Sequence, residues 1–135
     1  MPDPAVRRQS NKARRVKVDR VNKIKQEQND GHWNLVRFRS DTYDAYRAVE
    51  QTAFADGALS TKIKELMAIG ISIQAGCEPA IEKHIEAAAK LGASFEESLE
   101  AIEVGIAMGG GTAASAAHFA FHALDQFYSR EILKL

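Results

Sequence analysis

Residues 59–102, with the sequence LSTKIKELMAIGISIQAGCEPAIEKHIEAAAKLGASFEESLEAI, are divided by glycines into segments of helical length. Ser60 stands where the N-cap of a first helix is expected, and Gly76 stands where that helix would end. Pro79 falls in the first turn of a second helix, where its missing N–H group breaks no hydrogen bond, and Gly92 ends that helix. The stretch therefore predicts two consecutive helices joined near Gly76.

Apolar residues recur at helical spacing in both segments. In the first helix they follow the i, i+3, i+4, i+7, i+8 pattern of one buried stripe. The members of this stripe are Ile63, Leu66, Met67, Gly70 and Ile71. Ile69 and Ile73 widen it, so we expect this helix to lie at the centre of the core. The inner face of the second helix is predicted to consist of Ile81, Ile85, Ala88 and Ala89.

The segments before this stretch also indicate helices rather than strands, because no period-2 alternation of any length is present. We expect a short helix from about Asp19 to about Gln28, ended by the segment NDGHW with Gly31 in a turn. A longer helix should follow, capped by Ser40 or Asp41.

The segments after this stretch continue the pattern. Ser94 and Glu97 have the spacing of a capping box and predict a further helix, and the last helix is expected from about Thr112 onward. The fold class predicted for the whole chain is all-α, a bundle of five or six helices.

Composition and length agree with one folded domain. The chain has 135 residues, of which 45% are hydrophobic and 27% are charged. No apolar run approaches the roughly 20 residues of a membrane span, and the N-terminus lacks the apolar core of a secretory signal. Cys77 is the single cysteine, which excludes an intramolecular disulfide and agrees with a reducing compartment. We therefore expect a cytoplasmic protein with no membrane partner.

Charge is distributed unevenly along the chain. Residues 1–25 carry nine Lys and Arg against Asp3 and Asp19, a net charge of +7, so the remainder carries −7. Such an arm could contact nucleic acid, or it could lie on the acidic body of its own or a neighbouring subunit. No aromatic residue interleaves these charges, and no zinc spacing or RNP motif is present, which disfavours nucleic acid. We assign residues 1–40 to a basic arm and residues 41–135 to a helical domain.

The arm also contains a short apolar docking segment. We expect it to pack into the helical bundle or to contact a neighbouring subunit. Its members are Trp33, Leu35, Val36 and Phe38.

Three residues suggest chemistry. Cys77 stands at a helix N-terminus, which favours the reactive thiolate, and His84 follows two turns later on the same side of the helix. Two antiparallel helices joined near Gly76 would bring Glu65 back toward His84, and a carboxylate, an imidazole and a thiol in this order form a proton relay. Two simpler interpretations stay open, a Cys77 that is only a small core residue and a Glu65 that pairs with Lys62.

The same stretch resembles the core of the carboxymuconolactone decarboxylase family, which includes the alkylhydroperoxidase D-like proteins. The resemblance covers about residues 43–127, and MGGGTAASAAHFAFHALDQF is similar to the closing helix of that family. The family motif is a Glu, a Cys-x-x-Cys pair that begins twelve residues later, and a His four residues after the second Cys. Glu65, Cys77 and His84 match it. The resemblance implies an alkylhydroperoxidase D-like helical bundle that assembles into homotrimers or homohexamers, with the site near a subunit interface.

The sequence departs from the motif at its second cysteine, where it has Ala80. In the family, redox members reduce hydroperoxides through the cysteine pair, whereas the decarboxylase members lack both cysteines and use acid–base groups. An internal disulfide cycle cannot operate within this chain. A sulfenic acid formed at Cys77 would have to be resolved by an external thiol or by another subunit.

Three functions follow from these residues. The first is a single-cysteine peroxidase in which Cys77 attacks a hydroperoxide, His84 moves protons, Glu65 orients His84, and an external thiol is the reductant. The second is an acid–base enzyme acting on a small carboxylated or lactone-type substrate through Glu65 and His84. The third is a non-catalytic assembly protein of the same fold.

Other candidate sites carry weaker signals. His118 and His122 have an i, i+4 spacing that can bind a metal, but only Asp125 stands nearby as a third ligand, so packing is the better interpretation. The segment GGGT lacks the lysine and the preceding strand of a phosphate-binding loop, and we interpret it as a turn. We therefore predict neither a metal nor a cofactor.

Overall fold

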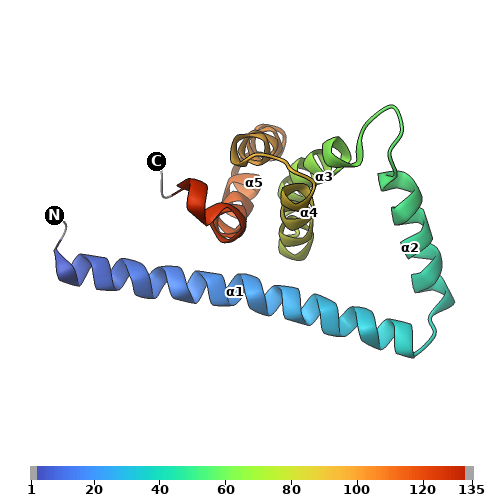
Figure 1. Ribbon diagram of the computed structural model, residues 1–135, viewed down its shortest axis with the longest axis horizontal. Coiled ribbons are helices and arrows are strands. Elements are labelled where there is room, and N and C mark those ends of the chain that lie inside the picture. Colours follow the sequence, from blue (N-terminus) through green and yellow to red (C-terminus); the bar gives the residue numbers. More distant parts are fainter. Residues whose placement is uncertain (1–2, 133–135) are drawn as a thin grey trace.

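The computed structural model describes residues 3–132, apart from the side chains of residues 17, 18 and 129–132. Within these residues the chain forms helices and no strand. In chain order the helices are α1 (Pro4–Arg37), α2 (Asp41–Phe54), α3 (Thr61–Ala75), α4 (Glu78–Lys90) and α5 (Phe95–Ile132). Figure 1 shows the long α1 running along one side of a bundle of α3, α4 and α5, with α2 standing apart from that bundle. The predicted all-α class is confirmed.

The ends of the central helices are formed as their sequences predict. The Ser60 hydroxyl accepts a hydrogen bond from the backbone N–H of Ile63 at 3.2 Å, and Gly76 ends α3 in the left-handed conformation, with φ of 67°. At the start of α5, Ser94 and Glu97 each accept a hydrogen bond from the other's backbone N–H, at 3.0 and 2.8 Å. These caps fix the two ends of α3 and the start of α5. The turn at Gly76 sets the direction in which the chain reverses between α3 and α4.

The core lies where α3, α4 and α5 meet. Its largest fully buried side chains on these three helices are Ile69, Ile73, Ile81, Ile85 and Leu124. Ala88 is also buried and Ala89 packs against the core, so the inner face predicted for α4 is confirmed. Burying an aliphatic side chain of this size contributes about 1.5–3 kcal/mol, which makes this three-helix contact the main source of stability.

The buried stripe predicted for α3 is wrong. Ile63, Met67 and Ile71 are 42%, 50% and 65% exposed. The face that α4 and α5 cover is the neighbouring one, formed by Ala68, Ile69, Ser72 and Ile73. Apolar residues surround most of α3, so their spacing allowed two faces, and the packing of α4 and α5 decided which one is buried.

Two glycines shape α5 and its contact with α3. A Cβ atom at Gly105 would lie 2.7 Å from the backbone oxygen of Gly70, so only glycine allows the two helices to approach this closely. Gly110 has φ of 65° and ψ of −143°, which interrupts the helical backbone of α5. The predicted turn in the GGGT segment is therefore a kink between two helical halves of α5.

The short arm helix predicted between Asp19 and Gln28 is wrong, because α1 is continuous over 34 residues. Asp3 caps its start, and the first turns are rich in Ala, Arg, Lys and Gln, which favour helix. Gly31 lies inside the helix, where glycine costs only about 1 kcal/mol relative to alanine. That cost alone is too small to end the helix, which tertiary contacts hold on the N-terminal side of Gly31.

Those contacts join α1 to the acidic body of its own chain, one of the two placements that the charge distribution allowed. Arg14 pairs with Asp125 at 3.1 Å, and Lys25 pairs with Glu86 at 2.6 Å. Val21 is fully buried against the core. Because partly exposed ion pairs contribute little each, we attribute the docking mainly to Val21 and the apolar groups around it.

The far end of α1 and the whole of α2 project from the bundle (Figure 1). Ser40 caps α2 as predicted, and none of the residues of α2, all of which the structure describes, is buried. The Tyr43 hydroxyl lies 2.7 Å from Nδ1 of His32, which ties the two helices together. Trp33 and Phe38 are exposed, so the expectation that this segment packs into the bundle is wrong. Its contact with a neighbouring subunit stays a prediction.

Candidate active site

Glu65 of α3 and His84 of α4 are in contact. The Glu65 Oε2 atom lies 2.6 Å from His84 Nδ1, because α3 and α4 fold back on each other at Gly76. Their side chains are only 12% and 13% exposed. The expected contact is therefore confirmed. The alternative pairing of Glu65 with Lys62 is wrong, because Lys62 instead reaches Glu97 at 3.1 Å.

The imidazole of His84 is held in a defined orientation. Phe54 of α2 stacks on it, with ring centroids 5.4 Å apart and an angle of 7° between the planes. When Nδ1 donates to the Glu65 carboxylate, Nε2 is the nitrogen that can exchange a proton with a substrate or a water molecule. The carboxylate also stabilises the imidazolium form that such an exchange produces. Glu65 and His84 thus have the geometry of an acid–base pair.

A cavity of about 320 Å³ lies beside this pair. It is lined by His32, Tyr43, Arg47, Glu50, Gln51, Phe54, Glu65 and Lys83. Two of these side chains, Arg47 and Lys83, are cationic, and Lys83 is paired with Glu50. Arg47 lies 3.8 Å from Asp44, so both cations have carboxylates nearby, and the cavity as a whole offers an acid–base pair and polar walls to a small polar molecule.

Cys77 lies apart from this cavity. It is the N-cap of α4, it is exposed, and its Sγ atom makes no capping hydrogen bond. Seven residues of helix separate Cys77 from His84, which corresponds to roughly 10 Å along the axis. Ala80, half-buried, lies between them, one turn from His84. The structure thus brings two of the three predicted site residues together and leaves the thiol about two turns away along α4.

The opposite side of α4 presents an ionisable residue that sequence reasoning missed. Glu82 is only 3% exposed. Burial and the neighbouring charge of Glu86 raise the pKa of Glu82 to about 7. In the sequence, Glu82 and Glu86 look like ordinary surface acids at i, i+4. The one signal was the position of Glu82 next to Ile81 on the inner face, and α1 has to dock on α4 before Glu82 is buried.

The described residues form no candidate metal site. His118 is exposed, and no group of three or more His, Cys, Asp or Glu side chains in the described part of the chain could hold a metal ion. Among the helices as described, none is both long enough and apolar enough to cross a membrane.

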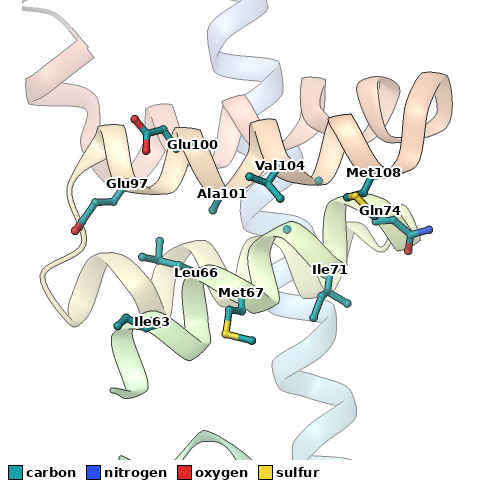
Figure 2. Close-up of a pocket in the computed structure, with 12 residues that line it drawn as sticks. Ile63, Leu66, Met67, Ile71, Gln74, Glu97, Glu100, Ala101, Val104 and Met108 are labelled. Carbon is teal, nitrogen blue, oxygen red and sulfur yellow. The ribbon is translucent and has the colours of Figure 1, made fainter. Parts of the chain in front are cut away.

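The exposed apolar face of α3 forms one wall of a groove against α5, with a volume of about 650 Å³. Figure 2 shows Met67 and Ile71 on α3, and Val104 and Met108 on α5, on either side of this α3–α5 groove. Contiguous apolar surface of this kind marks an interaction site more often than an accident of folding.

The sequence profile of the carboxymuconolactone decarboxylase family matches residues 40–123. The chain belongs to this family. The matched region contains the whole of α3 and α4, and therefore Glu65, Cys77 and His84.

Two bacterial proteins are similar to this chain in sequence. The chain is 37% identical over 83 residues to uncharacterized protein 4 in the cox locus of Paracoccus denitrificans, which covers 62% of this chain and 75% of that protein. It is 34% identical over 70 residues to an uncharacterized protein of Cupriavidus necator, covering 52% of this chain and 62% of that protein.

Two crystal structures share the fold. A carboxymuconolactone decarboxylase family protein from Legionella pneumophila, in its apo form, superposes with a TM-score of 0.77 at 28% identity, covering 81% of this chain and 97% of that one. The protein TM1620 from Thermotoga maritima superposes with a TM-score of 0.74 at 22% identity, covering 81% and 96%, which supports the fold alone.

Proposed function

We propose that this chain is a thiol-dependent peroxidase in which Cys77 attacks a hydroperoxide and the Glu65–His84 pair supplies the proton. The observation that carries the proposal is the 2.6 Å contact of Glu65 with His84 on the same helix that presents an exposed thiol at its N-terminus. Free backbone N–H groups and the positive end of the helix dipole face an anion at this position, and the thiolate is the attacking form of cysteine.

The reaction balances without a second cysteine. The Cys77 thiolate forms a bond to one oxygen of the hydroperoxide, and the O–O bond breaks. The departing alkoxide takes a proton from the His84 imidazolium and leaves as an alcohol, while Cys77 becomes a sulfenic acid. Two equivalents of an external thiol then reduce the sulfenic acid to the thiol, and they form water and a disulfide of the reductant.

The separation between Cys77 and His84 defines what must bridge them. Side chains on a helix lean toward its N-terminus, so the imidazole of His84 reaches back over the turn that contains Ala80. We propose that a hydroperoxide or a water molecule bridges the sulfur and Nε2 beside the small side chain of Ala80. Proton transfer through one bridging molecule is sufficient for general acid catalysis.

A second candidate function is favoured by the lining of the cavity beside the pair. Arg47 and Lys83 share that cavity with Glu65, whereas Cys77 does not line it. In this case a small carboxylated or lactone-type substrate would bind to the cations, and Glu65 and His84 would move its proton without using the thiol.

One experiment separates the two candidates. Consumption of hydrogen peroxide and of an alkyl hydroperoxide is measured with dithiothreitol as reductant, for the unmodified chain and for Cys77→Ser. The peroxidase proposal predicts turnover that Cys77→Ser lowers at least about 100-fold, while the control Ala75→Ser leaves it unchanged. Full peroxide turnover in Cys77→Ser would rule out the thiol mechanism. Turnover of a carboxylated lactone that survives Cys77→Ser and is lost in His84→Gln would establish the acid–base alternative.

We further infer that the α3–α5 groove joins copies of this chain into a homo-oligomer. Met67, Ile71, Val104 and Met108 expose 50–77% of their surface, which is costly for a protein that stays monomeric. Light scattering during size exclusion should give a mass that is a multiple of 14.8 kDa. Met67→Glu should shift it to the mass of one chain, whereas Val6→Glu on α1 should not. A single-chain mass for the unmodified protein would disprove the inference.

A further inference from the structure

A second cavity, of about 740 Å³, lies between α1 and α4, and we call it the α1–α4 cleft. From α1 it is lined by amide side chains that share one face of the helix, Asn22, Gln26 and Asn29 at i, i+4 and i+7. From α4 it is lined by Glu82 and Glu86. After Ile24, α1 carries no apolar side chain until Trp33, so polar groups face each other across a gap where two helices would ordinarily pack through apolar ones.

The base of this cleft contains an unsatisfied acceptor. Glu82 is 3% exposed, and its Oε1 atom has no hydrogen-bond partner among the residues that the structure describes. A second buried oxygen in the same state is Oε1 of Gln126, whose Nε2 donates to Asn22 of the cleft at 2.8 Å. More than nine in ten buried polar groups have a partner, so the unsatisfied Oε1 acceptor of Glu82 in the wall of the cleft points to a ligand that donates hydrogen bonds, whereas Gln126 does not itself line the cleft.

The charges around the cleft indicate the sign of that ligand. Lys25 is paired with Glu86 at 2.6 Å, and Lys83 is paired with Glu50. Each of these lining cations therefore already has a carboxylate. Glu82 is the lining acid that makes no ion pair within the described residues. A cation is the complementary partner for such a group.

We propose that the α1–α4 cleft binds a small organic ammonium ion whose N–H groups donate to Oε1 of Glu82. The amide oxygens of Gln26 and Asn29 offer further acceptors, and the ring of Tyr43, which also lines the cleft, offers a face for a cation. The cleft adjoins the cavity beside the Glu65–His84 pair, because His32, Tyr43 and Lys83 line both, but Glu82 lines only the cleft and Glu65 only the other cavity. The proposal does not depend on the function proposed for that pair.

Binding of this kind is coupled to a proton. Burial and the charge of Glu86 raise the pKa of Glu82 to about 7, and they outweigh Lys25 and Lys90, which lower it. Lys83 and His32 also face the cleft. At pH 7 about half of the molecules hold a proton on Glu82, and an ammonium ion that contacts the carboxylate displaces it.

The test is titration calorimetry of the full chain with n-butylammonium chloride at pH 7, in two buffers of different ionisation enthalpy. We expect saturable binding with release of about half a proton per ligand, because the pKa of Glu82 is about 7. Glu82→Gln, a neutral variant of the same shape, should bind at least tenfold more weakly and release no proton. Glu27→Gln, an exposed acid on α1, should bind as the unmodified chain does.

Three results would overturn the proposal. They are the absence of saturable binding to the unmodified chain, equal affinity in Glu82→Gln, and equal or tighter binding of neutral n-butanol or of anionic butyrate. The proton release is measured on the unmodified protein, so the test stands even if Glu82→Gln fails to fold.

Discussion

Two acidic side chains lie on opposite sides of α4 and have different surroundings. Glu65 belongs to the neighbouring α3, and Glu82 belongs to α4 itself. Toward α3, Glu65 places its carboxylate 2.6 Å from His84, and Phe54 covers the ring. Toward α1, Glu82 is more deeply buried, and its Oε1 atom lacks any partner among the described residues. α4 therefore carries His84, which the Glu65 carboxylate of α3 fixes, and Glu82, whose buried Oε1 atom has no partner among the described residues.

The difference shows how position on one helix separates two kinds of function. A carboxylate paired with an imidazole orients it and stabilises its charged form, which prepares His84 for proton transfer. Burial, the charge of Glu86 and a hydrogen bond with Glu86 raise the pKa of Glu82 to about 7, so this carboxyl can exchange a proton for a ligand near neutral pH. We therefore propose a role in proton transfer for Glu65, and a role in ligand recognition and in the pH dependence of stability for Glu82.

The largest effect is expected on the α3 side. His84→Gln removes the group that protonates the departing alkoxide, so kcat/KM for hydroperoxide should fall about 100-fold. Glu65→Gln keeps a hydrogen-bonding side chain but removes the charge, and should cost about tenfold. The control is His118→Gln, at an exposed histidine on α5. Unchanged kcat/KM in His84→Gln would separate the pair from the reaction.

On the α1 side, Glu82→Gln should stabilise the protein at neutral pH. The carboxyl has a pKa of 4.5 when exposed and about 7 when folded. Below pH 4.5 the Glu82 carboxyl is protonated in both the folded and the unfolded protein, so its raised pKa does not lower the stability. As the pH rises toward 7 the unfolded state loses its proton first, so the stability of the unmodified chain falls. The raised pKa of Glu82 corresponds to a loss in the free energy of unfolding of at most roughly 3 kcal/mol.

This expectation is checked by urea denaturation at pH 4.5 and at pH 7.5. Glu82→Gln should have the higher midpoint at pH 7.5, and the gain should nearly vanish at pH 4.5. Glu103→Gln, at an exposed position on α5, should show neither change. A gain that is independent of pH would mean that the charge of Glu82 has no part in it.

The smallest effect is expected at the position between the thiol and the imidazole. Ala80→Cys places a second sulfur one turn from His84 and lets a disulfide form with Cys77, so an internal cycle becomes available. Peroxide turnover with dithiothreitol should rise several-fold to about tenfold. Ala80→Ser changes polarity without adding a thiol and should not raise it. A fall in turnover in Ala80→Cys would show that the space above Ala80 is needed for substrate.

Much of the central fold could be predicted, because local signals determine it. Ser60, Gly76 and the Ser94–Glu97 box end or start helices through hydrogen bonds to their own neighbours in the chain. The contact of Glu65 with His84 followed from the reversal at Gly76 and the lengths of the two helices.

The wrong predictions share a different cause, since each depended on which helix covers which face. The spacing on α3 allowed Ile63, Met67 and Ile71 to be buried, but α4 and α5 pack on the adjacent face. The continuous α1 was missed because its docking on the body through Val21 and Lys25 could not be foreseen, and Gly31 alone costs too little to end the helix. Glu82 was missed for the same reason, because its burial results from that docking.

Oxidation of Cys77 by a hydroperoxide can be detected by chemical trapping. The chain is treated with one equivalent of an alkyl hydroperoxide in the presence of dimedone and analysed by mass spectrometry after digestion. We expect a dimedone adduct on Cys77 in amounts close to one per chain, and a large loss of this adduct in His84→Gln. Consumption of the hydroperoxide with Cys77 left as an unmodified thiol would contradict it.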